Sequence, residues 1–178
     1  MIVGRDNLIK MFPNFKDDIQ ENGIDLRVGE VYELSDDLIH YNGGQIIGCI
    51  NDKKFLPNLK KVELTDFTGF ADGGAVYVLE PRQFYFIKVD RDIEIPHGYC
   101  QCYFIRSTFT RCGLRLLDSW GDDGFKGRLM LGLYNTNKAT PIVMGANERI
   151  IQAVTIENDG TASEYNGSYQ NNKTELRV

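Results

Sequence analysis

The sequence has little of what several common classes of protein need. It has only two histidines, His40 and His97, and none of its four cysteines forms a CxxC pair. A structural zinc site is therefore not expected. The H-x-E and P-C-x-x-C elements that hold the metal in zinc-dependent nucleobase deaminases are also absent. That class of enzyme is excluded.

Long apolar runs and excess positive charge are missing too. No run approaches the roughly 20 apolar residues of a membrane span, and Arg5 and Asp6 lie where a signal peptide needs its apolar core. We therefore expect a cytoplasmic protein with no membrane partner. The formal net charge is −5 and the pI about 5.1, which gives no electrostatic footprint for nucleic acid.

What the sequence does contain is a series of strand-like runs separated by Gly, Asn and Asp. Before them, apolar residues from Leu8 to Phe12 predict one short helix that Pro13 ends. The runs favour an all-β fold, either a jelly-roll β-sandwich or a small barrel. They are IDLRVGEVYEL, QIIGCI, AVYVL, QFYFIKV, GYCQCYFI, GRLMLGLYN, TPIVM and RIIQAVTIE.

The run from Leu129 to Tyr134 is apolar at almost every position, so we expect both of its faces to be covered, by a second sheet or by a partner subunit. With 178 residues the chain fits one domain. We place that domain at residues 1–157. Residues 158–178 are polar and rich in Asn, Ser and Gly, and are predicted to form a flexible arm.

The segment from Ile105 to Asn135 carries the most chemistry. Arg106 offers a rigid donor fork for phosphate oxygens, and Ser107 and Thr108 add hydroxyl groups beside it. Asp122 follows in a glycine-framed hairpin and is a candidate general base. Taken alone, Asp122 could equally be an ordinary hairpin tip, where Asp and Gly suit the turn.

Five segments in order resemble the dUTPase and dCTP deaminase superfamily, and most closely its archaeal-type dUTPases. Each matches one motif of that superfamily, and together they cover nearly the whole chain. They are Asn22–Gly29 (NGIDLRVG), Ile105–Gly113 (IRSTFTRCG), Asp122–Gly127 (DDGFKG), Asn147–Gln152 (NERIIQ) and Tyr165–Gln170 (YNGSYQ).

The resemblance implies a distorted jelly roll that forms a homotrimer with active sites shared between subunits. It implies that Asp122 is the catalytic base and that Asp25 contacts a hydrated Mg²⁺ through water or buttresses the site, although Asp25 could also simply pair with Arg27. The implied substrate contacts are Arg106, Ser107, Thr108, Arg111, Phe125, Gln152, Tyr169 and Gln170. Phe125 would pack on the deoxyribose or in the core, and Tyr169 would stack over uracil.

One position separates the two reactions of this superfamily. Deaminases carry a proton-shuttling glutamate in the strand after the hairpin, and Gly132 occupies that position here. General acid–base catalysis contributes about 10²–10⁴-fold, so deamination is disfavoured. The sequence therefore predicts a Mg²⁺-dependent dUTP diphosphatase that yields dUMP and pyrophosphate. The alternatives are a dCTP deaminase, alone or bifunctional, and a non-catalytic regulatory protein that binds nucleotides.

Other residues receive plainer interpretations. Trp120 is predicted to be a hydrophobic anchor for the hairpin, and Arg149 to have a structural role. Lys53, Lys54, Lys60 and Lys61 are expected to form a solvated face.

Overall fold

The computed structural model describes residues 1–34, 39–41, 44–46, 59–68, 74–117, 119–160, 163, 165–167 and 169–172, with only the backbone given at 39–41 and 44–46. Lys53 and Lys54 lie outside these residues, as does Ser168 in the arm. No helix in the described part of the chain is long and apolar enough to cross a membrane.

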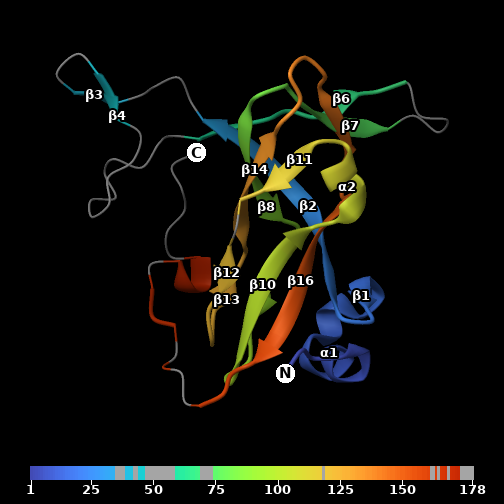
Figure 1. Ribbon diagram of the computed structural model, residues 1–178, viewed down its shortest axis with the longest axis vertical. Helices are drawn as coiled ribbons and strands as arrows, with labels where there is room; N and C mark the ends of the chain where they lie inside the picture. Colours follow the sequence, from blue (N-terminus) through green and yellow to red (C-terminus); the bar gives the residue numbers. More distant parts are fainter. Residues whose placement is uncertain are drawn as a thin grey trace.

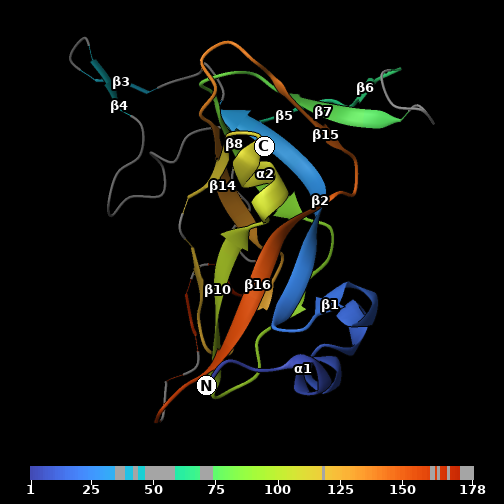
Figure 2. The same cartoon turned by 45° about the vertical axis from the view of Figure 1, so that its right-hand side comes forward.

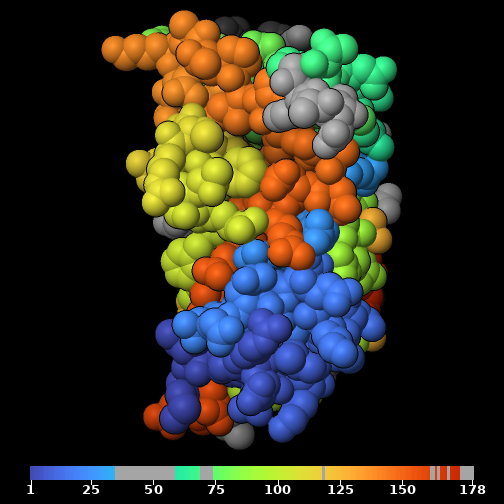
Figure 3. All heavy atoms as spheres, turned by 90° about the vertical axis from the view of Figure 1, so that its right-hand side faces the viewer, coloured from blue at the N-terminus to red at the C-terminus, as the bar shows by residue number. Residues whose placement is uncertain are grey.

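The predicted N-terminal helix is present as α1 (Arg5–Met11), which buries Leu8 against the sheet. The helix ends where predicted. Pro13 begins a separate 3₁₀ turn, η1 (Pro13–Asp18), which buries Phe15 and Asp18. In Figure 3 these N-terminal residues, in blue, form the lower half of one side of the molecule.

The rest of the described chain is mostly strand, as predicted, and the strand-like runs that fall within it all contain strands (Figure 1). The largest sheet has the order β11-β14-β8-β2-β16-β10-β12, with β1 and β5 also paired to β2. Its strands are β1 (Ile19–Gln20), β2 (Gly23–Leu34), β5 (Leu59–Lys61), β8 (Phe84–Val89), β10 (Tyr99–Ile105), β11 (Leu114–Leu116), β12 (Trp120–Gly121), β14 (Met130–Asn135) and β16 (Arg149–Glu157).

Three smaller sheets complete the fold. β15 (Ile142–Gly145), β7 (Ala75–Leu79) and β6 (Thr65–Asp66) form one, and β13 (Lys126–Gly127) pairs with β9 (Ile93–Glu94). β3 (Ile39–Tyr41) pairs with β4 (Gly44–Ile46). The remaining helical elements are α2 (Ser107–Arg111) and the short turn η3 (Gln170–Asn172).

The long strand β2 joins the two halves of the large sheet. Its first half pairs with β16 and its second half with β8, and the register shifts between Val28 and Glu30. Such an irregularity bends a strand and increases its twist. Figure 2 shows β2 running along the length of the molecule between these two groups of strands.

The core lies where the inward faces of the strands meet. Along β14, Leu131 and Leu133 are fully buried, and the intervening Gly132 and Tyr134 are only half-buried. In the single chain one face of this strand is therefore covered, and the expectation that both faces are covered is not met within one subunit. Buried and half-buried residues alternate along β14, which is the pattern of a strand with one face in the core and one face towards solvent.

Trp120 departs from its prediction. Its side chain is 55% exposed, so it does not anchor the hairpin in the core. Trp120 pairs with Cys102 of β10, which places both on the outward face of the sheet, with Phe104 two residues along the same strand. Phe104 is also exposed, at 53%. Trp120, Cys102 and Phe104 therefore form an apolar strip on this face of the single chain.

Candidate functional site

Two of the phosphate-binding residues predicted from sequence, Gln152 of β16 and Arg106 just after β10, lie on the same face of the large sheet. Phe104 of β10 is opposite Gln152 of β16, and Gln152 is opposite Asp25 of β2. Residues directly opposite each other in a sheet point to the same side, so the three side chains form a row. Arg106 follows two residues after Phe104 and extends from the same side.

Arg106 is held in place by two acceptors. Its Nη1 donates to the carbonyl of Arg149 at 3.1 Å, and its Nε lies 3.5 Å from Asp25 Oδ2. The Asp25 carboxylate is buried, and burial raises its pKa although Arg106 acts in the opposite direction. Because Asp25 sits beneath the guanidinium and away from solvent, its geometry suits orientation of Arg106. Of the alternatives for Asp25, pairing with Arg27 is not found, since Arg27 binds Asp18 instead.

The residues after Arg106 form a single helical turn, α2. Ser107, Thr108 and Arg111 are all exposed on it. Their side chains are accessible to solvent beside Arg106, and their predicted contact with substrate stays a prediction.

Arg149 has the structural role that was predicted, with partners in the N-terminal segment. Its Nε donates to Asp18 Oδ1 at 2.9 Å, and Arg27 and Arg91 bind the same buried carboxylate. Burial by itself raises the pKa of Asp18, but hydrogen bonding and the charges of these arginines lower it below its usual value. This cluster fixes η1 against β2 and β16.

Asp122 lies in a loop between β12 and β13, and the expected hairpin is not a simple one. β12 pairs with β10, whereas β13 pairs with β9, so the two arms have different partners. The tip is nevertheless a tight turn, in which Phe125 N donates to Asp122 O at 3.1 Å and Gly124 has a φ of 72°. A positive φ of this kind favours glycine.

Close packing at Gly121 sets the position of this loop. A Cβ at Gly121 would collide with the Tyr103 hydroxyl and lie 2.6 Å from Ile95 Cδ1. The Tyr103 hydroxyl is buried and donates to Gln101, which in turn donates to Thr155. Burial raises the pKa of Tyr103. A satisfied buried network therefore lies directly under the residue that precedes Asp122.

Asp123 is an anchor that sequence reasoning did not identify. Its carboxylate accepts hydrogen bonds from Gly98 N at 2.8 Å and Asn158 Nδ2 at 3.0 Å, and His97 Nδ1 lies 3.0 Å away. Burial alone raises the pKa of Asp123, but these hydrogen bonds lower it below its usual value. Asp123 thus connects the loop to the start of the arm.

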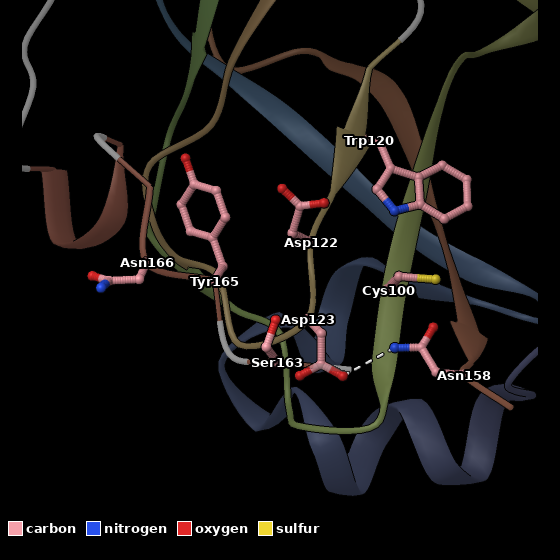
Figure 4. A pocket seen from close by; sticks show the side chains of 8 residues that line it. All are labelled: Cys100, Trp120, Asp122, Asp123, Asn158, Ser163, Tyr165 and Asn166. Carbon is pink, nitrogen blue, oxygen red and sulfur yellow. Dashed lines mark hydrogen bonds between the residues drawn. The ribbon is translucent and has the colours of Figure 1, made fainter. Parts of the chain in front are cut away.

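Asp122, in contrast, is exposed and borders an open cavity of about 550 Å³. Figure 4 shows its carboxylate between Tyr165 and Trp120. The cavity is lined by Cys100, Trp120, Asp122, Asp123, Asn158, Ser163, Tyr165 and Asn166. An accessible carboxylate in a cavity of this size can bind a hydroxyl group or orient a water.

The arm contributes residues to this region. The Tyr165 ring lies 5.8 Å from Phe125, and Tyr165 N donates to Asp123 O. Phe125 is buried beneath it. Tyr169 is 47% exposed, which leaves its ring accessible. Tyr165 was not predicted as a site residue, although an aromatic side chain in so polar a segment was a usable signal.

The two groups of predicted residues are separate in the single chain. Gly121 is opposite Gln101, which places Asp122 beside Cys100, six residues along β10 from Arg106. At roughly 3.3 Å per residue this is about 20 Å. A base must reach its proton directly or through one water. Asp122 and Arg106 of one chain therefore do not meet at one reacting phosphate.

Comparison with known proteins identifies the family of this chain. The family model described as dCTP deaminase-like matches residues 3–157, up to the end of β16. The chain belongs to the dCTP deaminase-like family. A relative from Methanothermobacter thermautotrophicus, named probable deoxyuridine 5′-triphosphate nucleotidohydrolase, is 37% identical over 170 residues, which are 96% of this chain and 99% of the relative.

Other proteins similar to this chain are named dCTP deaminases. A protein of Pyrobaculum calidifontis named dCTP deaminase is 28% identical over 91% of this chain and 82% of its own length. The crystal structure of 2′-deoxycytidine 5′-triphosphate deaminase from Agrobacterium tumefaciens aligns with a TM-score of 0.60 and 16% identity, over 86% of this chain and 47% of that one. This likeness confirms the predicted fold class.

Gly132, where the sequence resemblance would place a deaminase glutamate, lies on β14 opposite Phe86 of β8. A Cβ at Gly132 would meet the Phe84 ring at 3.1 Å and Leu117 Cδ1 at 3.3 Å. Apolar side chains therefore border the space that a side chain at position 132 would enter.

Proposed function

We propose that this protein is a dUTP diphosphatase, which hydrolyses dUTP to dUMP and pyrophosphate. The observation that carries the proposal is the accessible carboxylate of Asp122 in its cavity, combined with a glycine at the position of the deaminase glutamate. The name of the 37% identical relative supports the same reaction. The relatives named dCTP deaminase make deamination the alternative to test.

The chemical step is attack of a water on the α-phosphorus. Asp122 orients this water and accepts its proton, and pyrophosphate leaves in line with the attack. One carboxylate is enough for this reaction, since no proton has to be delivered to an amine. Positioned general-base catalysis of this kind contributes about 10²–10⁴-fold.

The triphosphate binds on the outward face of β10 and β16. Arg106, oriented by Asp25, supplies a two-pronged donor, and Ser107, Thr108 and Gln152 add neutral donors beside it. Arg111, exposed at the end of α2, is assigned as a further cation of the substrate site. Tyr169 is the aromatic residue assigned to uracil. Phe125 is buried beneath Tyr165 and takes the core role that was the alternative to packing on the deoxyribose.

We assign Mg²⁺ as an ion that binds together with the triphosphate of the substrate. The described residues include no group of three or more His, Cys, Asp and Glu side chains that could hold a metal. Mg²⁺ is usually bound through substrate phosphates, waters and one or two carboxylates, and we assign it to the triphosphate of the substrate. When bound it neutralises charge on the phosphates. Asp25 is assigned to orienting Arg106.

A homotrimer with shared sites would bring the two groups of residues together. Because Asp122 and Arg106 of one chain are about 20 Å apart along β10, we propose that each site combines Asp122 of one subunit with the phosphate-binding residues of another. The exposed Phe104 lies next to Gln152 on the same face. A neighbouring subunit that covers Phe104 would thus place its own loop beside the phosphates. We further propose that the enzyme acts in the cytoplasm.

The deciding experiment measures pyrophosphate release from dUTP and Mg²⁺. The wild-type protein should release pyrophosphate, and Asp122→Asn should reduce the rate by about 10²–10⁴-fold while a non-hydrolysable dUTP analogue still binds. Asp66→Asn, an exposed carboxylate on β6, is the matched control and should keep full activity. Full activity in Asp122→Asn would disprove the assignment.

The same samples separate the alternatives. Release of ammonia from dCTP would identify a deaminase. Tight binding of dUTP with no product from either nucleotide would identify a regulatory nucleotide-binding protein.

A further inference from the structure

The loop that carries Asp122 has one free strand edge. On one side, Phe125 O accepts from Ile95 N at 2.8 Å and Gly127 pairs with Ile93. Backbone groups of successive residues in a strand alternate in direction. The backbone groups of Gly124, Lys126 and Arg128 therefore point away from β9, where they meet no strand in the described part of the chain.

Side chains of the arm close this edge. Gln170 Oε1 accepts from Lys126 N at 2.8 Å, and its Nε2 donates to Gly124 O at 2.8 Å. Asn172 Oδ1 accepts from Arg128 N at 2.7 Å. The two arm residues are two apart in sequence, as are the two N–H groups that they bind. Figure 1 shows this part of the arm, in red, beside β13.

This arrangement uses the polar atoms of Gln170 within its own chain. The side chain of Gln170 is only 8% exposed, and its carboxamide oxygen and nitrogen each have a backbone partner. Buried backbone groups need partners, and leaving them unpaired is costly. Withdrawal of Gln170 to contact a nucleotide would leave two backbone groups of the loop without a partner.

The same contacts act on the turn that presents Asp122. Gly124, whose carbonyl Gln170 binds, is inside the turn closed by the Phe125 N to Asp122 O hydrogen bond. Tyr165 N holds the carbonyl of Asp123 from the same segment of the arm. The arm thus fixes the loop on both sides of Gly124. A base must be held within a fraction of an ångström of its productive position.

We propose that Gln170, assisted by Asn172, is a positioning residue for the loop of its own subunit and holds Asp122 in place before any nucleotide binds. This replaces the direct nucleotide contact that the sequence resemblance implies for Gln170. The consequence for catalysis rests on the proposed function of Asp122. The clamp itself depends only on the contacts of the arm.

Hydrogen exchange on the full chain without nucleotide tests the clamp directly. Gln170→Ala should raise the exchange rate of the Lys126 amide about tenfold, because that amide loses its acceptor. Gln170→Glu keeps the acceptor but cannot donate to Gly124 O, so its exchange rate should lie between those of the wild type and Gln170→Ala. Asn171→Gly is the matched control, since Asn171 has a φ of 55° and an exposed side chain that makes no hydrogen bond within the described residues. An unchanged Lys126 amide in Gln170→Ala would overturn the proposal.

Kinetics then separates positioning from nucleotide contact. Positioning predicts that Gln170→Ala lowers kcat by about 10–100-fold and that affinity for a non-hydrolysable dUTP analogue changes less than about threefold. Gln170→Glu should recover part of kcat. A loss of analogue affinity beyond about tenfold, with unchanged exchange, would instead make Gln170 a nucleotide ligand. If the wild-type protein releases no pyrophosphate, the proposed function fails, and the exchange data still decide the clamp.

Discussion

Asp122 and Asp123 are adjacent, yet their carboxylates occupy opposite environments. Asp123 is buried with donors from Gly98, Asn158 and His97, whereas Asp122 is exposed at the cavity. The two residues lie at the start of the turn closed by the Phe125 N to Asp122 O hydrogen bond, where one carboxylate anchors the loop and the other faces the cavity. The anchor and the candidate base are therefore distinct.

Asp123→Asn should destabilise the protein without removing the candidate base. Gly98 N and Asn158 Nδ2 both donate to Oδ2, so an amide can keep these two bonds only by placing its nitrogen against His97 Nδ1 in place of Oδ1. The loss of a hydrogen bond to a charged, buried group costs about 1–3 kcal/mol. For a chain of this length that lowers Tm by several degrees, at roughly 2–4 °C per kcal/mol. Calorimetry measures the change, and Asp159→Asn, an exposed carboxylate, is the control. Equal Tm values for the two variants would refute the anchoring role.

The lowered pKa of Asp123 gives this prediction a pH dependence. A carboxyl group whose pKa is lower in the folded state contributes stability above its unfolded pKa of about 3.9, and that contribution is lost as pH falls through the folded pKa. The difference in unfolding free energy between wild type and Asp123→Asn should therefore have its largest value near pH 6 and become smaller below about pH 4. Denaturant titrations at several pH values measure it. A difference that grows on acidification would contradict the assignment.

The sequence predicted most of the fold because its strands follow local rules. The run RIIQAVTIE is strand β16 from end to end, and AVYVL is β7. The prediction that Trp120 is buried was wrong, because burial depends on which strands become neighbours. The alternation of apolar and polar residues along one strand does not reveal its neighbours. The separation of about 20 Å along β10 between Asp122 and Arg106 was equally hidden, since the order of motifs in a sequence carries no distance. The anchoring role of Asp123 could not be predicted, because the sequence does not show that Asn158 and Gly98 lie next to its carboxylate.

Gly121→Ala should disrupt the catalytic loop. The added methyl group would lie within 3 Å of the Tyr103 hydroxyl and of Ile95, and neither can retreat because both are buried. Overpacking of this kind costs about 1–3 kcal/mol. We expect a lower Tm and loss of pyrophosphate release. Gly74→Ala, where a Cβ meets nothing within 4 Å, should change neither. Wild-type behaviour of Gly121→Ala would show that the loop does not depend on this contact.

Phe104→Lys should break the proposed trimer. Phe104 is an exposed aromatic residue next to Gln152, and a lysine there would place a charge in the interface between subunits. Light scattering should give about three times the chain mass for the wild type and a smaller mass for the variant. Activity should fall in parallel, since each site needs two subunits. Leu64→Lys changes another exposed apolar residue, at 45%, and should leave the mass unchanged.

Gly132→Glu should not create a dCTP deaminase. A side chain at this position would start 3.1 Å from the Phe84 ring and 3.3 Å from Leu117, closer than nine in ten real Cβ contacts. The carboxylate would have to pass an apolar border before reaching a base, and a proton shuttle must lie within hydrogen-bonding distance of its target. We expect no ammonia from dCTP with Gly132→Glu, and none when Phe84→Ala is added to make room. Ammonia release by the single variant would show that only the glutamate separates this chain from a deaminase. Release by the double variant alone would show that Phe84 is the barrier.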